Sequence, residues 1–237
     1  MAPTAHTQHS HPTLTNIFQA GISLIPMLVA TLLPYSVSAA PLKDATALPD
    51  LSSFSLSVQN GDADLLRGVY VNGLFALPVA QQPSSNAAYV STLDNTITQF
   101  SLASQFGSVG LLAHNNLSGQ YFFQLMSGMV IVLIYGDGRI EYYQVSHVYR
   151  YQATAPQSVY SDFIDLDTQE YLSGSALFKK VYMGPKHITF QTCISQNGNS
   201  SWGRFFVLAE PFQYSSSLAG AHRSIQPGVF RYLNNRR

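Results

Sequence analysis

The sequence predicts a mainly β domain whose sheet closes into a barrel, with only short helices. Six short runs rich in β-branched and aromatic residues carry this prediction, and no amphipathic helix of convincing length accompanies them. Because six or more short strands must hide their edges, a closed sheet is favoured over an open one. The six runs are residues 68–78, 109–113, 129–135, 139–148, 187–192 and 203–209.

The clearest turn signal is Asp137-Gly138, which lies between the third and the fourth run. An Asp-Gly pair favours a two-residue hairpin in which both central residues take positive φ angles. Short helices are predicted over residues 93–105 and 158–178, and Gly174 interrupts the second of them. The predicted domain, residues 67–214, therefore combines strands with two short helical segments.

The composition excludes some classes of chain and of partner. Of the 237 residues, 46% are hydrophobic and only 10% are charged, where about 25% is typical, so a disordered polyelectrolyte is excluded. Twelve Lys and Arg balance 12 Asp and Glu, and this neutral charge does not favour a nucleic-acid partner. The 14 Tyr and 14 Phe supply the bulk for a core, so we expect one domain with tails.

The amino-terminal segment has the pattern of an export signal. The first 42 residues contain no Asp, Glu, Lys or Arg, and residues 22–33 form a nearly unbroken apolar run. The small residues of Val37-Ser38-Ala39 are typical of signal-peptidase cleavage after Ala39. Residues 14–33 could instead remain as an uncleaved anchor of about the 20 residues that cross a bilayer. We therefore predict a signal peptide or membrane anchor over residues 1–39, with the rest of the chain outside the cytoplasm.

Two further segments flank the predicted domain. Residues 40–66 are rich in Ser, Ala and Asp without a sustained period, which is typical of a flexible linker. Residues 215–237 form a polar tail that carries four of the 12 positive charges.

Cys193 is the only cysteine of this expected exported chain. Secreted proteins use cysteines in pairs, so a single one indicates pairing between chains or reactivity. A buried cysteine that acts as a small hydrophobic residue is the structural alternative. With a strand period of two, Cys193 shares its face with Thr189 and Gln191, opposite Ile188, Phe190 and Thr192. The thiol is therefore expected on the more polar face of its strand.

A second strand follows Cys193 after a loop that contains Asn197-Gly198-Asn199, and this pattern predicts an antiparallel hairpin. Such pairing brings Arg204 close to Cys193. A guanidinium beside a thiol stabilises the thiolate and supplies hydrogen-bond donors for an oxyanion. An arginine that caps the loop is the structural alternative.

His114 is the best-placed base for such a thiol. It ends the apolar run of residues 109–113 and opens a polar stretch, so it is expected at a strand exit, where functional residues collect. His147, His187 and His222 fit packing or solvent-exposed positions better. A histidine satisfied by a backbone partner is the alternative for His114.

Together these residues resemble the sortase family of cysteine transpeptidases. The resemblance consists of His114, then Thr189-Phe190-Gln191-Thr192-Cys193 at a strand end, then Arg204 eleven residues later. The order also fits, because sortases place the histidine first and the arginine last, whereas papain-like cysteine peptidases place the cysteine before the histidine. Leu77-Pro78-Val79 and the Tyr-rich residues 136–145 are further partial matches. The resemblance covers roughly residues 67–211, and it departs at Ala113, where sortases usually have Gly.

The resemblance implies a closed sortase-like β-barrel and a covalent two-step acyl transfer. Cys193 would attack a backbone carbonyl in the peptide sorting signal of an exported protein, and an amine acceptor would resolve the thioester. Arg204 would bind the substrate and stabilise the oxyanion, while His114 would protonate the leaving amine. Thr192 and Gln191 would shape the wall of the substrate groove. The chemistry requires no metal or other cofactor.

Two other functions remain open from the sequence. One is an exported cysteine peptidase that hydrolyses the same thioester, and the other is a catalytically inactive β-barrel binding module. Residues 151–185 depart from the family pattern, and this region could form a lid over the cleft. Its acidic residues could also bind Ca²⁺. Their spacing lacks the EF-hand pattern, which favours a solvated helix face. These acidic residues are Asp162, Asp165, Asp167 and Glu170.

Overall fold

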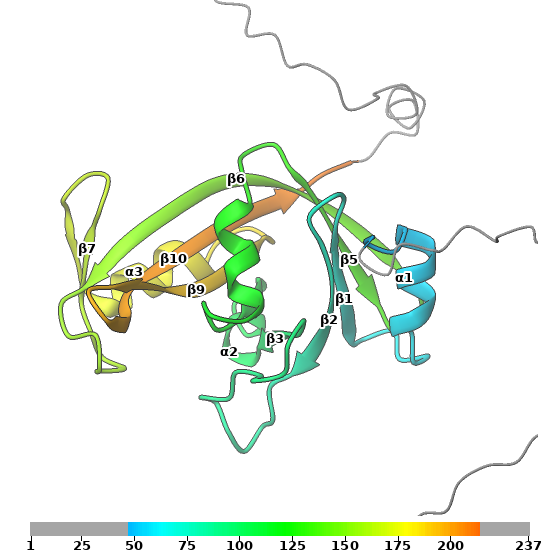
Figure 1. The fold of residues 1–237 in the computed structure, drawn as a ribbon, viewed down its shortest axis with the longest axis horizontal. Helices are drawn as coiled ribbons and strands as arrows, with labels where there is room; N and C mark the ends of the chain where they lie inside the picture. The colour runs from blue at the N-terminus through cyan, green and yellow to red at the C-terminus, as the bar shows by residue number, and fades with distance from the viewer. Residues whose placement is uncertain (1–46, 214–237) are drawn as a thin grey trace, which may run out of the picture. The chain divides into compact units, whose positions relative to one another are not determined.

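Strands make up most of the secondary structure in the computed structural model, which describes residues 47–213 (Figure 1). The elements of its first half are α1 (Leu51–Val58), β1 (Leu66–Val71), β2 (Phe75–Gln81), β3 (Ile97–Phe100), α2 (Ser101–Ser104), β4 (Val109–Leu112) and the 3₁₀ helix η1 (Ser118–Gln124). Those of the second half are β5 (Val130–Tyr135), β6 (Ile140–Ala153), β7 (Phe163–Asp165), β8 (Tyr171–Leu172), α3 (Gly174–Tyr182), β9 (Ile188–Gln196) and β10 (Asn199–Pro211).

Eight of these strands close into a ring. Neighbouring strands are hydrogen-bonded in the order β10-β9-β4-β3-β2-β1-β5-β6, and β10 also pairs with β6. β7 and β8 continue the sheet beyond β6 and stand outside the ring. The β2–β3 and β4–β9 pairs are parallel, whereas the hairpin pairs β1–β2, β5–β6 and β9–β10 are antiparallel. The prediction of a mainly β fold with a closed barrel and short helices is therefore confirmed.

Alternate residues of each strand point into the barrel or away from it. Phe190 of β9 and Val207 of β10 are completely buried in the barrel core. Phe206 faces the outside, where it belongs to a second apolar cluster that includes Leu177 of α3. The ring of Tyr182, also in α3, meets the Phe206 ring edge-on with 6.4 Å between centroids. Burial of each such side chain contributes about 1.5–3 kcal/mol, so both clusters hold the strands that carry the candidate site.

Helix α1 corrects the prediction that residues 40–66 form a linker. Asp50 begins the helix, because its Oδ1 accepts a hydrogen bond from the Ser53 amide at 2.9 Å. Phe54 and Val58 are buried against the outside of β1. They can approach β1 because Gly68 has no side chain; a Cβ at this residue would lie only 3.0 Å from both side chains. The apolar face of this single short helix is too small to recognise by periodicity, and part of the predicted linker belongs to the fold.

The β5–β6 hairpin forms where Asp137-Gly138 predicts it, but its turn is of another type. The Tyr135 amide donates to the Arg139 carbonyl at 2.9 Å, and the Gly138 amide donates to the Tyr135 carbonyl at 3.0 Å. The loop therefore contains three residues, with Gly136 first. Only Gly138 takes a positive φ, of 89°, as in a turn that ends in a left-handed glycine.

Both predicted helices are largely wrong. Residues 93–105 contain β3 and only the single turn α2, whereas residues 158–178 contain β7, β8 and the beginning of α3. β7 is extended because it pairs with the far end of β6, where Tyr151 lies opposite Asp165. The predicted strand over residues 68–78 is likewise a hairpin of β1 and β2, which turns at Gly73 with a φ of 72°. Pairing with distant strands outweighs the local preference in these segments.

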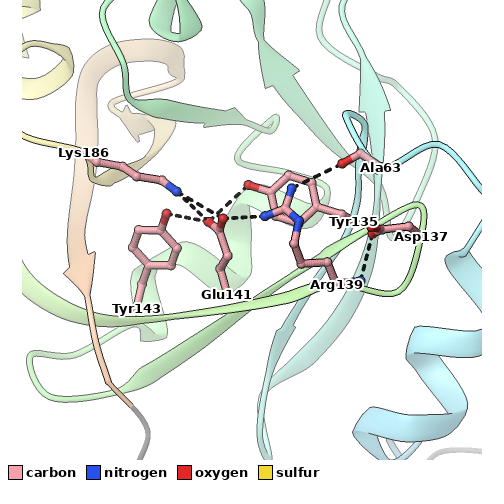
Figure 2. Close-up of polar contacts among 7 residues, drawn as sticks. All are labelled: Ala63, Tyr135, Asp137, Arg139, Glu141, Tyr143 and Lys186. Carbon is pink, nitrogen blue, oxygen red and sulfur yellow. Dashed lines mark hydrogen bonds and ion pairs between the residues drawn. The ribbon is translucent and has the colours of Figure 1, made fainter.

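A network of charged and phenolic groups surrounds Glu141 near the beginning of β6, as Figure 2 shows. The carboxylate accepts hydrogen bonds from Arg139 at 2.6 Å, Lys186 at 3.0 Å, Tyr143 at 2.9 Å and Tyr135 at 3.2 Å. Burial alone would raise the pKa of Glu141, but hydrogen bonds from Lys186 and Tyr143 lower it overall. Burial and the neighbouring carboxylate raise the pKa of Tyr143 far above its usual range. The network thus ties β6 to the segment that leads into β9.

The predicted leader or anchor at residues 1–39 lies outside the described residues, as does the predicted tail at residues 215–237. None of the helices within residues 47–213 has both the length and the apolar character needed to cross a bilayer. The boundaries of these flanking segments therefore stay predictions from the sequence.

Candidate active site

Cys193 and Arg204 are direct neighbours across the β9–β10 hairpin, as the sequence predicts. Phe190 on β9 and Phe205 on β10 point into the barrel core. By strand alternation, Cys193 and Arg204 therefore point to the outside of the barrel. Cys193 is partly exposed and free of any disulfide. The pairing places a thiol and a guanidinium side by side on one face of the sheet.

Two backbone carbonyl groups near the beginning of β10 orient the Arg204 guanidinium. Its Nη1 donates to the carbonyl oxygens of Ser201 and Gly203, each at 3.0 Å. Within residues 47–213 these are the contacts that hold the guanidinium, so the donors on Nε and Nη2 remain for a ligand. Arg204 therefore carries the predicted positive charge, and its guanidinium is held by carbonyl groups of its own strand rather than by the loop that the structural alternative names.

A cavity of about 650 Å³ lies over this face of the barrel and is lined by both Cys193 and Arg204. Its volume lies within the range of about 300–1,000 Å³ that is typical of ligand-binding pockets. Arg204 and Asp162 are the charged residues among its lining groups, and the rest is apolar or neutral. The lining includes Leu112 of β4, Phe178 and Tyr182 of α3, residues 158–163 before and within β7, and residues 173–175.

Gln191 lines the same cavity and is oriented by Tyr182. The Tyr182 hydroxyl donates to Oε1 of Gln191 at 2.6 Å. Burial raises the pKa of Tyr182 far above its usual range, so this hydroxyl remains a donor. Because Oε1 is held in this way, the amide nitrogen of Gln191 offers its two N–H donors on the other side of the group. The prediction that Gln191 shapes the groove wall is compatible with this position.

Thr192 does not line the cavity, which corrects its predicted place in the groove. The residue is 2% exposed and points inward, and its Oγ1 donates to the Ala113 carbonyl at 2.8 Å. Gly119 packs against this bond, since a Cβ at that residue would lie 2.3 Å from the Thr192 hydroxyl. Strand alternation explains the correction, because Thr192 lies between Gln191 and Cys193 and must face the other way. Its contact instead joins the end of β4 to β9.

His114 leaves β4 directly beside β9. The two strands are parallel, with Leu112 opposite Gln191, and the Ala113 amide donates to the Gln191 carbonyl at 3.3 Å. His114 is the next residue; its side chain is exposed and is not among the groups that line the cavity. Since β9 lies between β4 and β10, Cys193 lies on the middle strand, Arg204 on one neighbouring strand, and His114 two residues after the end of the other.

The backbone of His114 is held by its own loop. Its carbonyl oxygen accepts hydrogen bonds from the amides of Leu117 at 3.0 Å and Gly119 at 2.9 Å. The direction of the histidine side chain is therefore coupled to the loop between β4 and η1.

The acidic residues considered for Ca²⁺ serve the local structure instead. Asp162 accepts hydrogen bonds from the Tyr171 hydroxyl and, at 2.9 Å, from the Gly174 amide, which lower the pKa of its carboxyl. Asp165 accepts from the Asp167 and Thr168 amides at 2.9 and 3.1 Å. Within the described residues, no group of three or more His, Cys, Asp or Glu side chains could hold a metal ion.

The predicted solvated helix face is also absent here: Asp162 directly precedes β7, Asp165 ends it, and Asp167 and Glu170 lie in the loop that leads to β8.

Sequence reasoning missed two residues of this site. Tyr182 belongs to α3 and reaches Gln191 only through the packing of that helix on the barrel, so no local pattern marks it. Asn115 follows His114 in a polar stretch that reads as a loop, and its long-range contacts are visible only in three dimensions.

Several solved structures that resemble this chain are sortases, the family that the motifs resemble. Sortase A from Corynebacterium diphtheriae is 12% identical with a TM-score of 0.43, over 65% of this chain and 63% of that one. Sortase A from Listeria monocytogenes is 15% identical with a TM-score of 0.40, over 70% and 100%. Clostridium perfringens sortase C with the C-terminal cell wall sorting motif is 15% identical with a TM-score of 0.42, over 69% and 83%.

The chain thus spans less than two thirds of the length of the C. diphtheriae enzyme. No protein-family model and no curated protein matches the sequence.

Proposed function

We propose that this protein is a sortase-like cysteine transpeptidase, which cleaves a peptide sorting signal of exported proteins and transfers the acyl group to an amine. One observation carries the proposal. Cys193 and Arg204 are register partners that line one cavity, and His114 leaves the next strand beside them. A nucleophile, an oxyanion donor and a proton carrier are the groups that acyl transfer through a thioester requires.

In the first step, the Cys193 thiol gives its proton to the His114 imidazole and the sulfur attacks the peptide carbonyl. A carbon–sulfur bond forms, and the carbonyl electron pair moves onto oxygen. Arg204 stabilises this oxyanion through the donors on Nε and Nη2. When the intermediate collapses, the carbon–nitrogen bond breaks and His114 returns the proton to the leaving amine. The product of this half-reaction is a Cys193 thioester.

In the second step, an amine acceptor attacks the thioester carbon. Its proton passes to His114, the carbon–sulfur bond breaks, and the sulfur leaves as a thiolate that is reprotonated from the imidazolium. If water enters in place of the amine, the protein acts as a cysteine peptidase, which is the alternative function. The same residues serve both reactions, so the acceptor that reaches the thioester decides between them.

The cavity supports a peptide substrate. Its lining is mostly apolar, with Arg204 and the oriented Gln191 amide as donors beside the thiol. Backbone carbonyl groups of an extended peptide need such donors, while its apolar side chains need apolar walls. The partly exposed thiol also argues against the remaining alternative, an inactive binding module, because a cysteine that serves only packing is expected to be sealed in the core.

We also propose that the reaction takes place outside the cytoplasm, with residues 1–39 as a signal peptide or membrane anchor. Fractionation of cells that express the full chain tests this separately from catalysis. Recovery of the protein in the cytoplasmic fraction at its full, unprocessed mass would contradict it.

The catalytic proposal is tested by trapping the thioester. The full chain is incubated with a library of quenched peptides and with hydroxylamine or triglycine, and the products are read by mass spectrometry. We expect an acyl adduct on Cys193, hydroxamate with hydroxylamine and a ligated peptide with triglycine. Release of only the free acid in triglycine would indicate the peptidase, and the absence of any adduct would refute both enzymatic functions.

Matched variants assign the roles. Cys193→Ala is expected to abolish the adduct, and Arg204→Ala to lower its rate by about 100-fold or more, as loss of an oxyanion donor does. Arg150→Ala is the control, because Arg150 pairs with Asp167 on the surface away from the lining of the cavity. His114→Ala is compared in the same way with His147→Ala, which removes an exposed histidine of β6. Equal rates for a variant and its control would refute the role assigned to that residue.

A further inference from the structure

Asn115 connects the loop after β4 with both arms of the β9–β10 hairpin. Its Nδ2 donates to Oγ of Ser195 at 2.6 Å and to the Ser200 carbonyl at 3.1 Å. The Ser195 hydroxyl also donates to the Ser200 carbonyl at 3.4 Å. The three groups form a closed set of contacts between segments that are 80 and 85 residues apart in sequence.

The position of these contacts along the chain relates them to the proposed site. Asn115 directly follows His114, Ser195 lies two residues after Cys193, and Ser200 lies four residues before Arg204. A single amide group thus joins the three segments that carry the proposed proton carrier, nucleophile and oxyanion donor.

The Asn115 side-chain amide supports the segment of His114 beyond the last residue pair of β4 and β9. The last β4 pairing with β9 is at Leu112, and the Thr192 hydroxyl holds the Ala113 carbonyl from the inside of the barrel. Among residues 47–213, the partners of the His114 carbonyl are the amides of Leu117 and Gly119, which follow it closely in the chain. Asn115 is therefore the side chain that ties this loop to the hairpin on its exposed side.

We propose that Asn115 is a positioning residue, which sets the place of the His114 imidazole relative to Cys193 and Arg204 during acyl transfer. The inference rests on the proposed function and adds to it a residue that touches no substrate. The contacts are exposed, and hydrogen bonds exposed to water add little to folding stability. Loss of the Asn115 side chain is therefore expected to affect the rate of reaction much more than the stability of the fold.

The test compares Asn115→Ala with Asn116→Ala in the full chain. Asn116 is its exposed neighbour in the same loop, so the pair differs in the contact with the hairpin. We expect Asn115→Ala to lower kcat about 10- to 100-fold, the scale of a small misplacement of catalytic groups, with KM within twofold. Asn116→Ala should match the wild type. Asn115→Asp keeps the size of the side chain but loses the donor for the Ser200 carbonyl, so it should resemble Asn115→Ala.

A second measurement separates positioning from a general structural role. The rate at which iodoacetamide alkylates Cys193 is measured against pH, since a histidine held near a thiol shapes that profile. We expect an altered profile in Asn115→Ala and an unchanged one in Asn116→Ala, with both melting temperatures within about 2 °C of the wild type. Ser195→Ala should produce part of the Asn115→Ala effect. The variant that combines both changes should lose no more activity than Asn115→Ala alone.

The outcomes distinguish this inference from the proposed function. If the wild type forms a thioester and Asn115→Ala equals Asn116→Ala in kcat and in the alkylation profile, the positioning role is wrong and the proposed function stands. If Asn115→Ala loses activity only in proportion to a fall in melting temperature, the role is structural and the inference is wrong. If the wild type forms no thioester, both proposals fail.

Discussion

Replacement of Thr192 by valine isolates one buried hydrogen bond between the strand of the cysteine and the strand end that leads to His114. The Thr192 hydroxyl donates to the Ala113 carbonyl at 2.8 Å, and the side chain is 2% exposed. Valine substitutes a methyl group for the hydroxyl at nearly constant volume, and leaves the carbonyl without this donor. The space around the hydroxyl is also tight, because a Cβ at Gly119 would lie only 2.3 Å from it.

The magnitude follows from the burial. Loss of a partner by a buried polar group costs about 1–3 kcal/mol. For a domain of this length, 1 kcal/mol shifts the melting temperature by about 2–4 °C, so a cost near 2 kcal/mol lowers it by about 4–8 °C. The rate of thioester formation should fall as well, since the lost bond fixes the residue before His114. Thermal unfolding followed by circular dichroism and the peptide assay measure the two effects.

Thr192→Ser is the matched control. It keeps the hydroxyl and removes only a methyl group, so we expect a smaller loss of stability and a rate close to that of the wild type. A melting temperature of Thr192→Val within 1 °C of the wild type would refute the energetic reasoning. Equal loss of activity in the valine and serine variants would show that the hydrogen bond does not act through the strand end.

Three other changes test separate parts of the structure. Tyr182→Phe removes the hydrogen bond to Gln191 and should raise KM for the peptide severalfold while Cys193 alkylation is unchanged; an unaltered KM would contradict the orienting role. Since the folded pKa of Glu141 is lowered, its contribution to stability is present above its unfolded pKa and is lost as the pH falls through the folded value. Glu141→Gln should therefore be less stable than the wild type at pH 7, and melting curves should converge between about pH 5 and pH 3; a gap independent of pH would contradict this. Gly68→Ala places a Cβ 3.0 Å from two side chains of α1 and should lower the urea midpoint by an amount equivalent to about 1–3 kcal/mol, whereas no change would show that α1 is not tightly docked.

Local patterns predicted the elements that carry the thiol and the guanidinium. The period of two along β9 separates Phe190 from Cys193, and the turn residues after Gln196 predict the return of β10. Because a hairpin joins neighbours in sequence, its pairing follows from the lengths of two strands and a loop. The proximity of Arg204 and Cys193 could therefore be predicted without knowledge of the rest of the fold.

Placement of Thr192 shows the limit of motif reasoning even within a predicted strand. Its residue type and its position next to Cys193 suggested a groove residue, although the same alternation that exposes the cysteine turns Thr192 inward. Helix α1 was missed for a different reason. Phe54 and Val58 form too small an apolar face to recognise alone, and they are buried only because Gly68 leaves room on β1.

The sequence by itself determined that this is a β-rich chain with a cysteine on the outer face of a hairpin opposite an arginine. Those features depend on side-chain alternation and turn chemistry, which act over a few residues. Only the tertiary structure decided that β4 lies parallel to β9, that β6 closes on β10, and that α3 brings Tyr182 to the cavity. These pairings join segments tens of residues apart, and they are selected by which arrangement buries the apolar side chains of the barrel core and of the cluster around α3. The exit of the chain at His114 from the strand next to that of Cys193, and the contact of Asn115 with the hairpin, follow from that selection.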